Sequence, residues 1–569
     1  MKIWKHGIIM GFPAVLLALI LTACEMMKVP DPTEITYAVT QTGGANGQSD
    51  STGVVFTFSL PVDGLSLTAA DITVSGAAVK GSGVLTGTRT SRTLPITVTE
   101  GGTATVTITK NGIETAVKNV TVYKEGQLVP DPTELEYELI NNNTAYRVRK
   151  GNVTGGAVII PASYNGLPIT EIGSASDDLT NGAFSGTSIT SIAIPVGVTA
   201  IGSYAFSNCN RITSVTIPES VTFIGSSAFY NCNSITSINI PTGITTIANS
   251  AFSRCASLTS ITIPNTVTSI GDYAFYNCSS LTDINISTGV TTIANSAFSG
   301  CGRLTGITIP NAVTSIGDYA FANTSLISLH IPASVMSIGY AAFYDCGSLT
   351  SVTFAENSRL QTIGDSAFWN CTSLPGITIP ESVTFIGGGA FSNCSSLTSI
   401  EIPLSVTSIS DYMFSDCDSI TSINIPTSIT SIGNGAFYKC TGLTGITIPT
   451  TVTSIGNDAF SGCTGLISIN IPASVTFIGN DAFYNCTGLT SITIPEGVTS
   501  IGNFAFFFCT SLTSITIPAG VTFIGSYMFY YWTSKQTIYI EGHASQAAAD
   551  AAWGSGWRNG CGAVIKYRE

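Results

Sequence analysis

One pattern of apolar and polar positions repeats along most of this chain, and its clearest copy runs from Leu258 to Cys278. Its first part alternates apolar residues with Ser or Thr, which is the two-residue period of a β-strand, and Pro264 ends that strand because proline has no N–H to donate. Val267, Ile270, Ala274 and Phe275 then return to the core as the chain turns back. Gly271 is expected to supply a tight bend with positive φ.

The repeat has a period of about 23 residues, marked by an Ala-Phe or Met-Phe step. The spacing is 23 throughout except for 22 residues into Phe206 and Phe343 and 25 into Phe368. A fixed period of this length predicts a solenoid. The 16 anchor phenylalanines are Phe184, Phe206, Phe229, Phe252, Phe275, Phe298, Phe321, Phe343, Phe368, Phe391, Phe414, Phe437, Phe460, Phe483, Phe506 and Phe529.

A single unit of this repeat cannot fold alone. Each of its apolar side chains gains about 1.5–3 kcal/mol on burial, whereas fixing the backbone costs about 1–2 kcal/mol per residue and is larger in sum. The units must therefore stack, so that each buries its flanks on its neighbours and shares a parallel ladder with them.

The unit L-x-x-I-x-I-P-x-x-V-x-x-I-G-x-x-A-F-x-x-C resembles the BspA-type leucine-rich repeat of bacterial surface proteins. The resemblance extends from about Leu135 to the end of the chain. It implies a mostly β fold, a capped solenoid of about 16 coils with a parallel sheet. It departs from the generic leucine-rich repeat, because the place of that repeat's Asn or Cys after the strand is variable here, for example Thr266.

The segment before the solenoid predicts an export leader and a small β domain. Residues 1–24 have a basic start, a short apolar core and the ending Leu-Thr-Ala-Cys, which resembles a bacterial lipobox and implies a lipid on Cys24. The alternative is an ordinary secretory signal. Two copies of Val-Pro-Asp-Pro-Thr-Glu place linkers at 25–38 and 127–134. Short alternating runs over 39–126 resemble an immunoglobulin-like β-sandwich, either a binding module or a spacer.

The solenoid itself is divided into three parts. A degenerate repeat over 135–183 is interpreted as an N-terminal cap, 184–530 as the regular array, and 531–569 as a C-terminal cap. The C-terminal cap is expected to contain a short helix over Ser545–Trp553 and closing strands at Thr537–Ile540 and Ala563–Tyr567.

Thirteen of the 15 cysteines stand three residues after an anchor phenylalanine and should form a column. Export would allow disulfides between neighbours. The alternative, which we expect, is that each is a small buried thiol donating weakly to a backbone carbonyl. A column does not supply the tetrahedral cluster that zinc requires, and no cofactor or metal is expected.

Composition argues against catalysis and nucleic-acid binding. The net charge of −13 repels polyanions, and only 10% of residues are charged. Three histidines, no phosphate-binding glycine loop and no convergent acid pair predict a protein that is not an enzyme.

The residue between the two strand isoleucines points outward and forms an exposed row of Thr and Asn, with Ser, Gly or Asp283 two residues earlier. Good solubility in a strand explains most of these residues, but some are candidate ligand contacts. The candidates are Asn239, Asp283, Asn285, His330, Glu401, Asn424 and Asn470.

The family resemblance implies a lipid-anchored cell-surface adhesion protein that contacts extracellular matrix or another surface protein or glycan. Membrane contact is expected through the lipid anchor only, and no nucleic acid is expected as a partner. The alternative is a structural or antigenically variable surface array without a fixed ligand, which the near-identical coils also fit.

Overall fold

The computed structural model describes residues 37–45, 49–58, 67–76, 78–82, 84–88, 91–98, 102–110, 113, 117–122, 134–174 and 182–568. The chain divides into two compact units, 1–131 and 132–569. The predicted leader and Cys24 lie outside the described residues.

The first unit is built from antiparallel strands. A five-stranded sheet contains β1 (Tyr37–Ala45), β2 (Ser49–Phe58), β4 (Ala78–Lys80), β5 (Thr86–Gly87) and β6 (Ser91–Val98). A three-stranded sheet contains β3 (Ile72–Gly76), β7 (Gly102–Ile108) and β8 (Val117–Val122), and a short 3-10 helix, η2 (Ala69–Asp71), leads into β3. Both sheets contribute to one buried core, with Phe56 from one and Val106 from the other, so they pack face to face.

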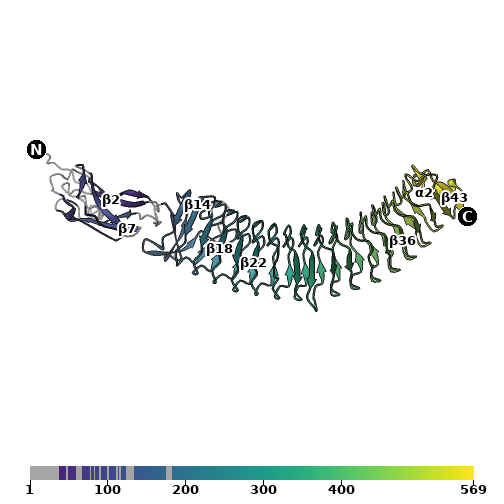
Figure 1. Cartoon of the computed structure of the whole chain (residues 1–569), viewed down its shortest axis with the longest axis horizontal. Helices are drawn as coiled ribbons and strands as arrows, with labels where there is room; N and C mark the ends of the chain where they lie inside the picture. Colours follow the sequence, from purple (N-terminus) through teal and green to yellow (C-terminus); the bar gives the residue numbers. More distant parts are fainter. Residues whose placement is uncertain are drawn as a thin grey trace, which may run out of the picture. The chain divides into compact units, whose positions relative to one another are not determined.

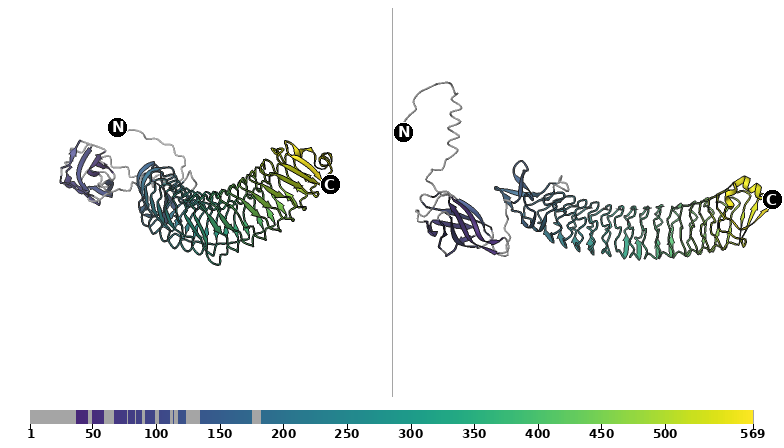
Figure 2. Two further views of the ribbon diagram at one scale, coloured as in Figure 1. Left: turned by 45° about the vertical axis from the view of Figure 1, so that its right-hand side comes forward. Right: turned by 90° about the horizontal axis from the view of Figure 1, so that it is seen from above.

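The second unit is a parallel β-solenoid of about 18 turns. This number exceeds the 16 turns that carry an anchor phenylalanine, because further turns without an anchor lie at the ends. The predicted fold class is confirmed. Figure 1 shows the turns stacked side by side in one curved array, and Figure 2 shows the same array in two further orientations. The array begins with β9 (Glu136–Ile140), β10 (Ala145–Arg149), β11 (Gly155–Ile159), β12 (Ser163–Tyr164) and β13 (Leu167–Ile172).

Most regular turns contribute two short strands, and each kind forms a row along the array. The first row, from the I-x-I segment, is β14 (Ser188–Ala193), β16 (Ser214–Thr216), β18 (Ser237–Asn239), β20 (Ser260–Thr262), β22 (Asp283–Asn285), β25 (Ser328–Ile331), β27 (Ser351–Phe354), β29 (Gly376–Thr378), β31 (Ser399–Glu401), β34 (Gly445–Thr447), β36 (Ser468–Asn470), β38 (Ser491–Thr493) and β40 (Ser514–Ile517).

The second row comes from the residues just before the glycine that recurs in the repeat unit. It is β15 (Ala200–Ile201), β17 (Phe223–Ile224), β19 (Thr246–Ile247), β21 (Ser269–Ile270), β23 (Thr292–Ile293), β24 (Ser315–Ile316), β26 (Ser337–Ile338), β28 (Thr362–Ile363), β30 (Phe385–Ile386), β32 (Ser408–Ile409), β33 (Ser431–Ile432), β35 (Ser454–Ile455), β37 (Phe477–Ile478), β39 (Ser500–Ile501) and β41 (Phe523–Ile524).

A third side of each turn surrounds the anchor phenylalanine. Here backbone amides donate to carbonyls of the following turn, as from Tyr273 to Asn295, from Phe275 to Ala297 and from Asn277 to Ser299. The anchor rings stack in one buried column, with centroids 5.2 to 6.3 Å apart from Phe184 to Phe529. This column and the isoleucines of both rows form the single core of the second unit.

The role expected for Gly271 was wrong. Its φ is not positive; instead, a Cβ there would lie 2.3 Å from Oδ1 of Asn249 and 2.8 Å from the Asn249 amide nitrogen. Glycine is needed because neighbouring turns approach closely at this point. The left-handed residues are those two before and two after the anchor, as at Tyr273 (φ 58°) and Asn277 (φ 54°).

The C-terminal end contains the predicted closing elements. These are β42 (Thr537–Glu541), α2 (Gln546–Trp553), the 3-10 helix η3 (Ser555–Arg558) and β43 (Val564–Arg568). β40, β42 and β43 pair in parallel, and α2 and β43 lie at the yellow end of the array (Figure 1). Ser545 caps α2 by accepting a hydrogen bond from the Ala548 amide.

Candidate functional site

The exposed face of the first strand row carries all seven predicted contact residues. Along each strand the burial alternates, so that in β31 Ser399 and Glu401 are exposed while Ile400 between them is buried. The outward orientation predicted for these positions is confirmed for Asn239, Asp283, Asn285, His330, Glu401, Asn424 and Asn470.

This face is not the continuous sheet that the repeat suggested. The first row is divided into shorter ladders, because no strand forms between β22 and β25 and β27 does not pair with β29. Its two hollows lie at these breaks. The row is also interrupted between β31 and β34 and between β38 and β40.

The larger hollow arises from the 25-residue turn before Phe368. Here Phe354 and Ala355 replace the usual Ile-Pro, and five residues rather than three separate Phe354 from Leu360, which fills the usual valine place. Asn357 adopts a left-handed φ of 57° within this longer loop. The two added residues carry the loop outward, and a groove forms between it and the strands.

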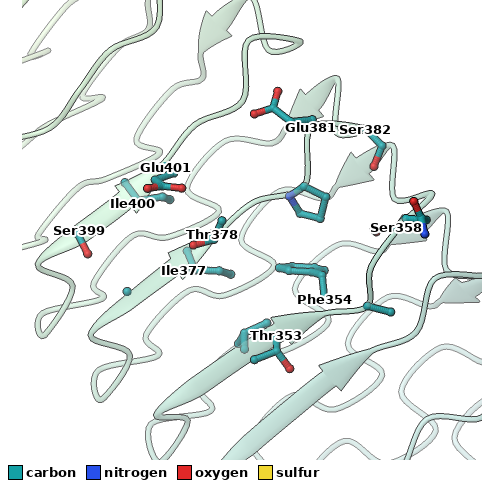
Figure 3. Close-up of a pocket in the computed structure, with 15 residues that line it drawn as sticks. Thr353, Phe354, Ser358, Ile377, Thr378, Glu381, Ser382, Ser399, Ile400 and Glu401 are labelled. Carbon is teal, nitrogen blue, oxygen red and sulfur yellow. The ribbon is translucent and has the colours of Figure 1, made fainter.

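This groove has a volume of about 720 Å³. Thr353, Thr378 and Glu401 come from three successive strands on one side, and Ser358 and Ser382 lie across from them on the loop side (Figure 3). Its floor includes apolar atoms of Phe354 and Ile377. Its charged lining residues are Glu381 and Glu401, so the groove offers hydroxyls, an aromatic ring and negative charge.

Ser382 shows how the longer loop changes the local bonding. At the same place in other turns, the hydroxyl donates to the carbonyl of the preceding turn, as from Ser428 to Val406 at 2.6 Å and from Ser474 to Val452 at 2.6 Å. The buried hydroxyl oxygen of Ser382 has no hydrogen-bond partner. The longer turn before it has moved its regular acceptor, so one polar atom in the groove wall is unsatisfied.

His330 lies next to this groove. Its Nδ1 and the Thr353 hydroxyl are 3.0 Å apart, and Thr353 lines the groove. Two of the predicted contact residues therefore belong to one region of the face. Glu401 lines the groove with Thr353 and Thr378, and His330 contacts Thr353 at its edge.

Asp283 and Asn285 line the smaller hollow, together with Thr305 and Thr308 of the next turn. Its volume is about 490 Å³. Asn239, Asn424 and Asn470 line neither hollow; Asn239 and Asn470 are exposed members of β18 and β36, and Asn424 forms an isolated bridge to Thr447.

The cysteine column supplies no reactive group. Its thirteen members are buried and form no disulfides. Each thiol donates to the carbonyl of the anchor phenylalanine one turn earlier, as from Cys255 to Phe229 at 3.2 Å. Burial raises the pKa of Cys255 to about 12. Among the described residues, no three His, Cys, Asp or Glu side chains gather in a way that would hold a metal ion.

Sequence reasoning recorded the 25-residue spacing but did not connect it with a groove. The signal was present, because the same turn also lacks the strand-ending proline. Since β27 of this turn pairs with β25 but not with β29, the groove lies where the longer turn meets the strand that follows it.

Comparison with known proteins identifies the array. A family model described as BspA type leucine rich repeat region matches residues 177–305, 269–374, 291–421, 361–489 and 430–551. Curated proteins give no significant match. Within the part of the chain that the structure describes, no helix has the length and apolar character to cross a membrane.

Two solved structures illustrate the similarity. A leucine-rich repeat protein from Bacteroides ovatus is 28% identical over 77% of this chain and 98% of its own, with a TM-score of 0.51. A leucine rich cell surface protein from Faecalibacterium prausnitzii is 31% identical over 60% of this chain and 93% of its own, with a TM-score of 0.40. Because the family model spans well over half of its residues, the chain belongs to the BspA-type leucine-rich repeat family.

Proposed function

We propose that this is a non-enzymatic adhesion protein of the bacterial cell surface, exported and held at the membrane by a lipid on Cys24. Its partner would be an extracellular matrix protein, or another surface protein or glycan. The exposed first-row face makes the contact, and the groove beside Glu401 is its strongest point. The observation that carries this proposal is the groove itself, which interrupts an otherwise repetitive face.

The chemistry of the face supports this role. Regularly spaced hydroxyls and amides offer many weak hydrogen bonds to an extended chain, and such contacts add up when they are linked on one scaffold. The groove adds an aromatic surface, Phe354, and two carboxylates, Glu381 and Glu401, without a lining cation. A partner segment carrying a basic side chain beside an apolar one fits these groups.

The test is a binding screen of the purified chain against immobilised matrix proteins and glycans. Glu401→Thr restores the residue found at Thr353 and Thr378 and should keep the fold while weakening capture of the partner at least about tenfold. Phe385→Thr is the matched control, because it changes an exposed residue of the second row to one that Thr246 shows the fold accepts. Equal loss in both variants would contradict a site in the groove.

A second candidate function is a structural or antigenically variable array. Outside the two hollows, the exposed first-row positions repeat as Thr and Asn, which gives no turn a private ligand site. A variant with the order of its turns rearranged decides between the two. Binding that survives rearrangement, or absence of any partner in the screen, would favour the array without a fixed ligand.

The surface location has its own test. In intact cells, external protease should remove the solenoid, and Cys24→Ala should release the protein from the membrane fraction. Retention of the Cys24→Ala chain in that fraction would contradict the lipid anchor without affecting the binding proposal.

A further inference from the structure

The last turns of the solenoid carry a cluster of aromatic residues on the third side of the coil, away from both strand rows. The cluster comprises Phe504, Phe507 and Phe508 from one turn and Tyr527, Tyr530 and Tyr531 from the next. The Phe504 and Tyr527 rings stack at 5.2 Å, and the Phe507 and Tyr530 rings at 5.1 Å. Three of the six are substantially exposed: Phe508 (38%), Tyr527 (39%) and Tyr531 (53%).

The fold does not require aromatic residues at Phe508 and Tyr531. Both are left-handed, with φ of 59° and 69°, a conformation that costs free energy for a bulky L-residue and suits Gly, Asn or Asp. The equivalent place in the other turns is mostly Asn, Asp or Gly, as at Asn277 and Gly300. Strained, exposed aromatic residues that packing does not explain indicate a functional surface.

The rings form a hollow rather than a flat patch. Tyr531 stands perpendicular to Phe507 and to Phe508, at 88° in both cases, with ring centroids 5.5 and 5.2 Å apart. With Tyr484 and Asn485 these rings line a hollow of about 480 Å³. That volume falls within the range of about 300–1,000 Å³ typical of small-molecule sites, and the lining combines aromatic rings with two tyrosyl hydroxyls and one amide.

Asn485 is the amide at this hollow, beside the tyrosyl hydroxyls, and its neighbours in the column leave its side chain available. In the same column, Asn231 donates from its side-chain amide to Asn208, one turn earlier, at 2.8 Å. The corresponding neighbours of Asn485 are Gly462 and Phe508, and neither has a side chain that can hydrogen-bond. An amide can both donate to and accept from a ligand hydroxyl.

The geometry and charge restrict the ligand. The ring centroids of Phe507, Phe508 and Tyr531 lie 5.2 to 6.4 Å apart, so a ligand lies across the outer surface of these rings and not between them. None of the lining residues is charged. Asp481 stands one turn before Phe504 in the same column, and the chain is acidic overall, so a sulfated or carboxylated polymer is disfavoured.

We infer that this aromatic hollow binds a neutral saccharide. The apolar face of a sugar ring would pack on Phe508 and Tyr531, and its hydroxyls would bond to Asn485 and to the tyrosyl hydroxyls. The site is separate from the first-row groove and does not depend on the adhesion function proposed for that face.

The experiment uses the full chain and a panel of neutral oligosaccharides built from glucose, galactose, mannose, N-acetylglucosamine or fucose. Binding is measured by isothermal titration calorimetry. The test variant is Phe508→Asn combined with Tyr531→Asn, which restores the residue found at Asn485 and should fold at least as stably as the parent. Phe385→Thr is the control, because it removes an exposed aromatic ring from the second strand row, outside the hollow.

At least one saccharide should bind the parent chain, and the double variant should bind it at least tenfold more weakly, with the Phe385→Thr control unchanged. Binding that is undiminished in the double variant would overturn the proposal, as would absence of binding to every saccharide in the panel. Self-association or protein capture that the double variant abolishes, with no saccharide bound, would also overturn it and assign the hollow to a protein contact.

Discussion

The thiol of Cys278 donates a hydrogen bond to the carbonyl oxygen of Phe252, one turn earlier, at 3.1 Å. The same carbonyl accepts the backbone amide of Cys255 at 3.2 Å. The contact recurs from turn to turn, and in the last turn the indole nitrogen of Trp532 takes the place of the thiol, donating to Phe506 at 3.0 Å. The cysteines therefore link neighbouring turns by hydrogen bonds, as expected, and are not paired with one another.

The column thiols should be unreactive in the folded protein. The reactive species is the thiolate, and burial raises the pKa of Cys301 and Cys509 to about 12, well above any ordinary assay pH. In a Cys24→Ser, Cys561→Ser background, iodoacetamide at pH 8 should label the native chain only as fast as it unfolds, and all thirteen sites in denaturant. Mass spectrometry provides the count; rapid native labelling or disulfides between neighbouring turns would contradict it.

Stability should fall steeply in alkali. The unfolded thiols lose their protons above about pH 8.5, whereas folded ones such as Cys463 and Cys394 keep theirs until about 12. Their stabilising contribution is thus complete below pH 8.5 and is lost as pH rises toward 12, at about 1.4 kcal/mol per pH unit for each affected thiol.

Urea unfolding followed by circular dichroism between pH 8 and 10 measures this loss. A variant in which several column cysteines are replaced by serine should be less stable at pH 7 but should show a shallower decline. Equal slopes for both proteins would show that the thiols do not control the alkaline transition.

Gly479→Ala should strongly destabilise the array. A Cβ at Gly479 would lie 2.4 Å from the Gly456 carbonyl carbon and 2.5 Å from the Asn457 amide nitrogen, and backbone atoms cannot move aside without separating two turns. We expect a loss of about 1–3 kcal/mol, as for overpacking a core. Gly302→Ala is the matched control, because nothing lies within 4 Å of its added Cβ. Thermal unfolding should separate the two variants clearly.

Ser382→Ala and Ser428→Ala should have opposite effects. The Ser382 hydroxyl is buried without a partner, so its removal should be neutral or stabilising by up to about 1 kcal/mol. The Ser428 hydroxyl donates to Val406, and its removal should cost about 0.5–1.5 kcal/mol. Denaturant midpoints at fixed pH provide the comparison, and a loss of stability in both variants would show that Ser382 has a partner in solution.

The sequence was sufficient to predict the solenoid because its period is enforced at every turn. A residue such as Ile261 must be buried while Thr262 is exposed, and a one-residue shift would reverse the whole face. The anchor phenylalanines and the cysteines could be located for the same reason, since each repeats at a fixed distance and packs on its own copy.

The sequence did not reveal contacts between residues that stand at different places in the repeat unit and on different turns. Phe508 and Tyr531 are 23 residues apart and each is an exception within its own turn, so their meeting with Phe507 becomes evident only when the turns are stacked. Gly271 was misinterpreted because a glycine required for close approach and one required for positive φ have the same signature in a single sequence.

The breaks in the two strand rows never fall at the same junction. Where β27 fails to pair with β29, β28 and β30 of the same turns remain paired; where β30 and β32 separate, β29 and β31 remain joined. The breaks of the two rows are therefore staggered along the array. Every pair of neighbouring turns is therefore joined by at least one paired strand row, so a force that pulls along the array would have to break backbone hydrogen bonds wherever two turns separate.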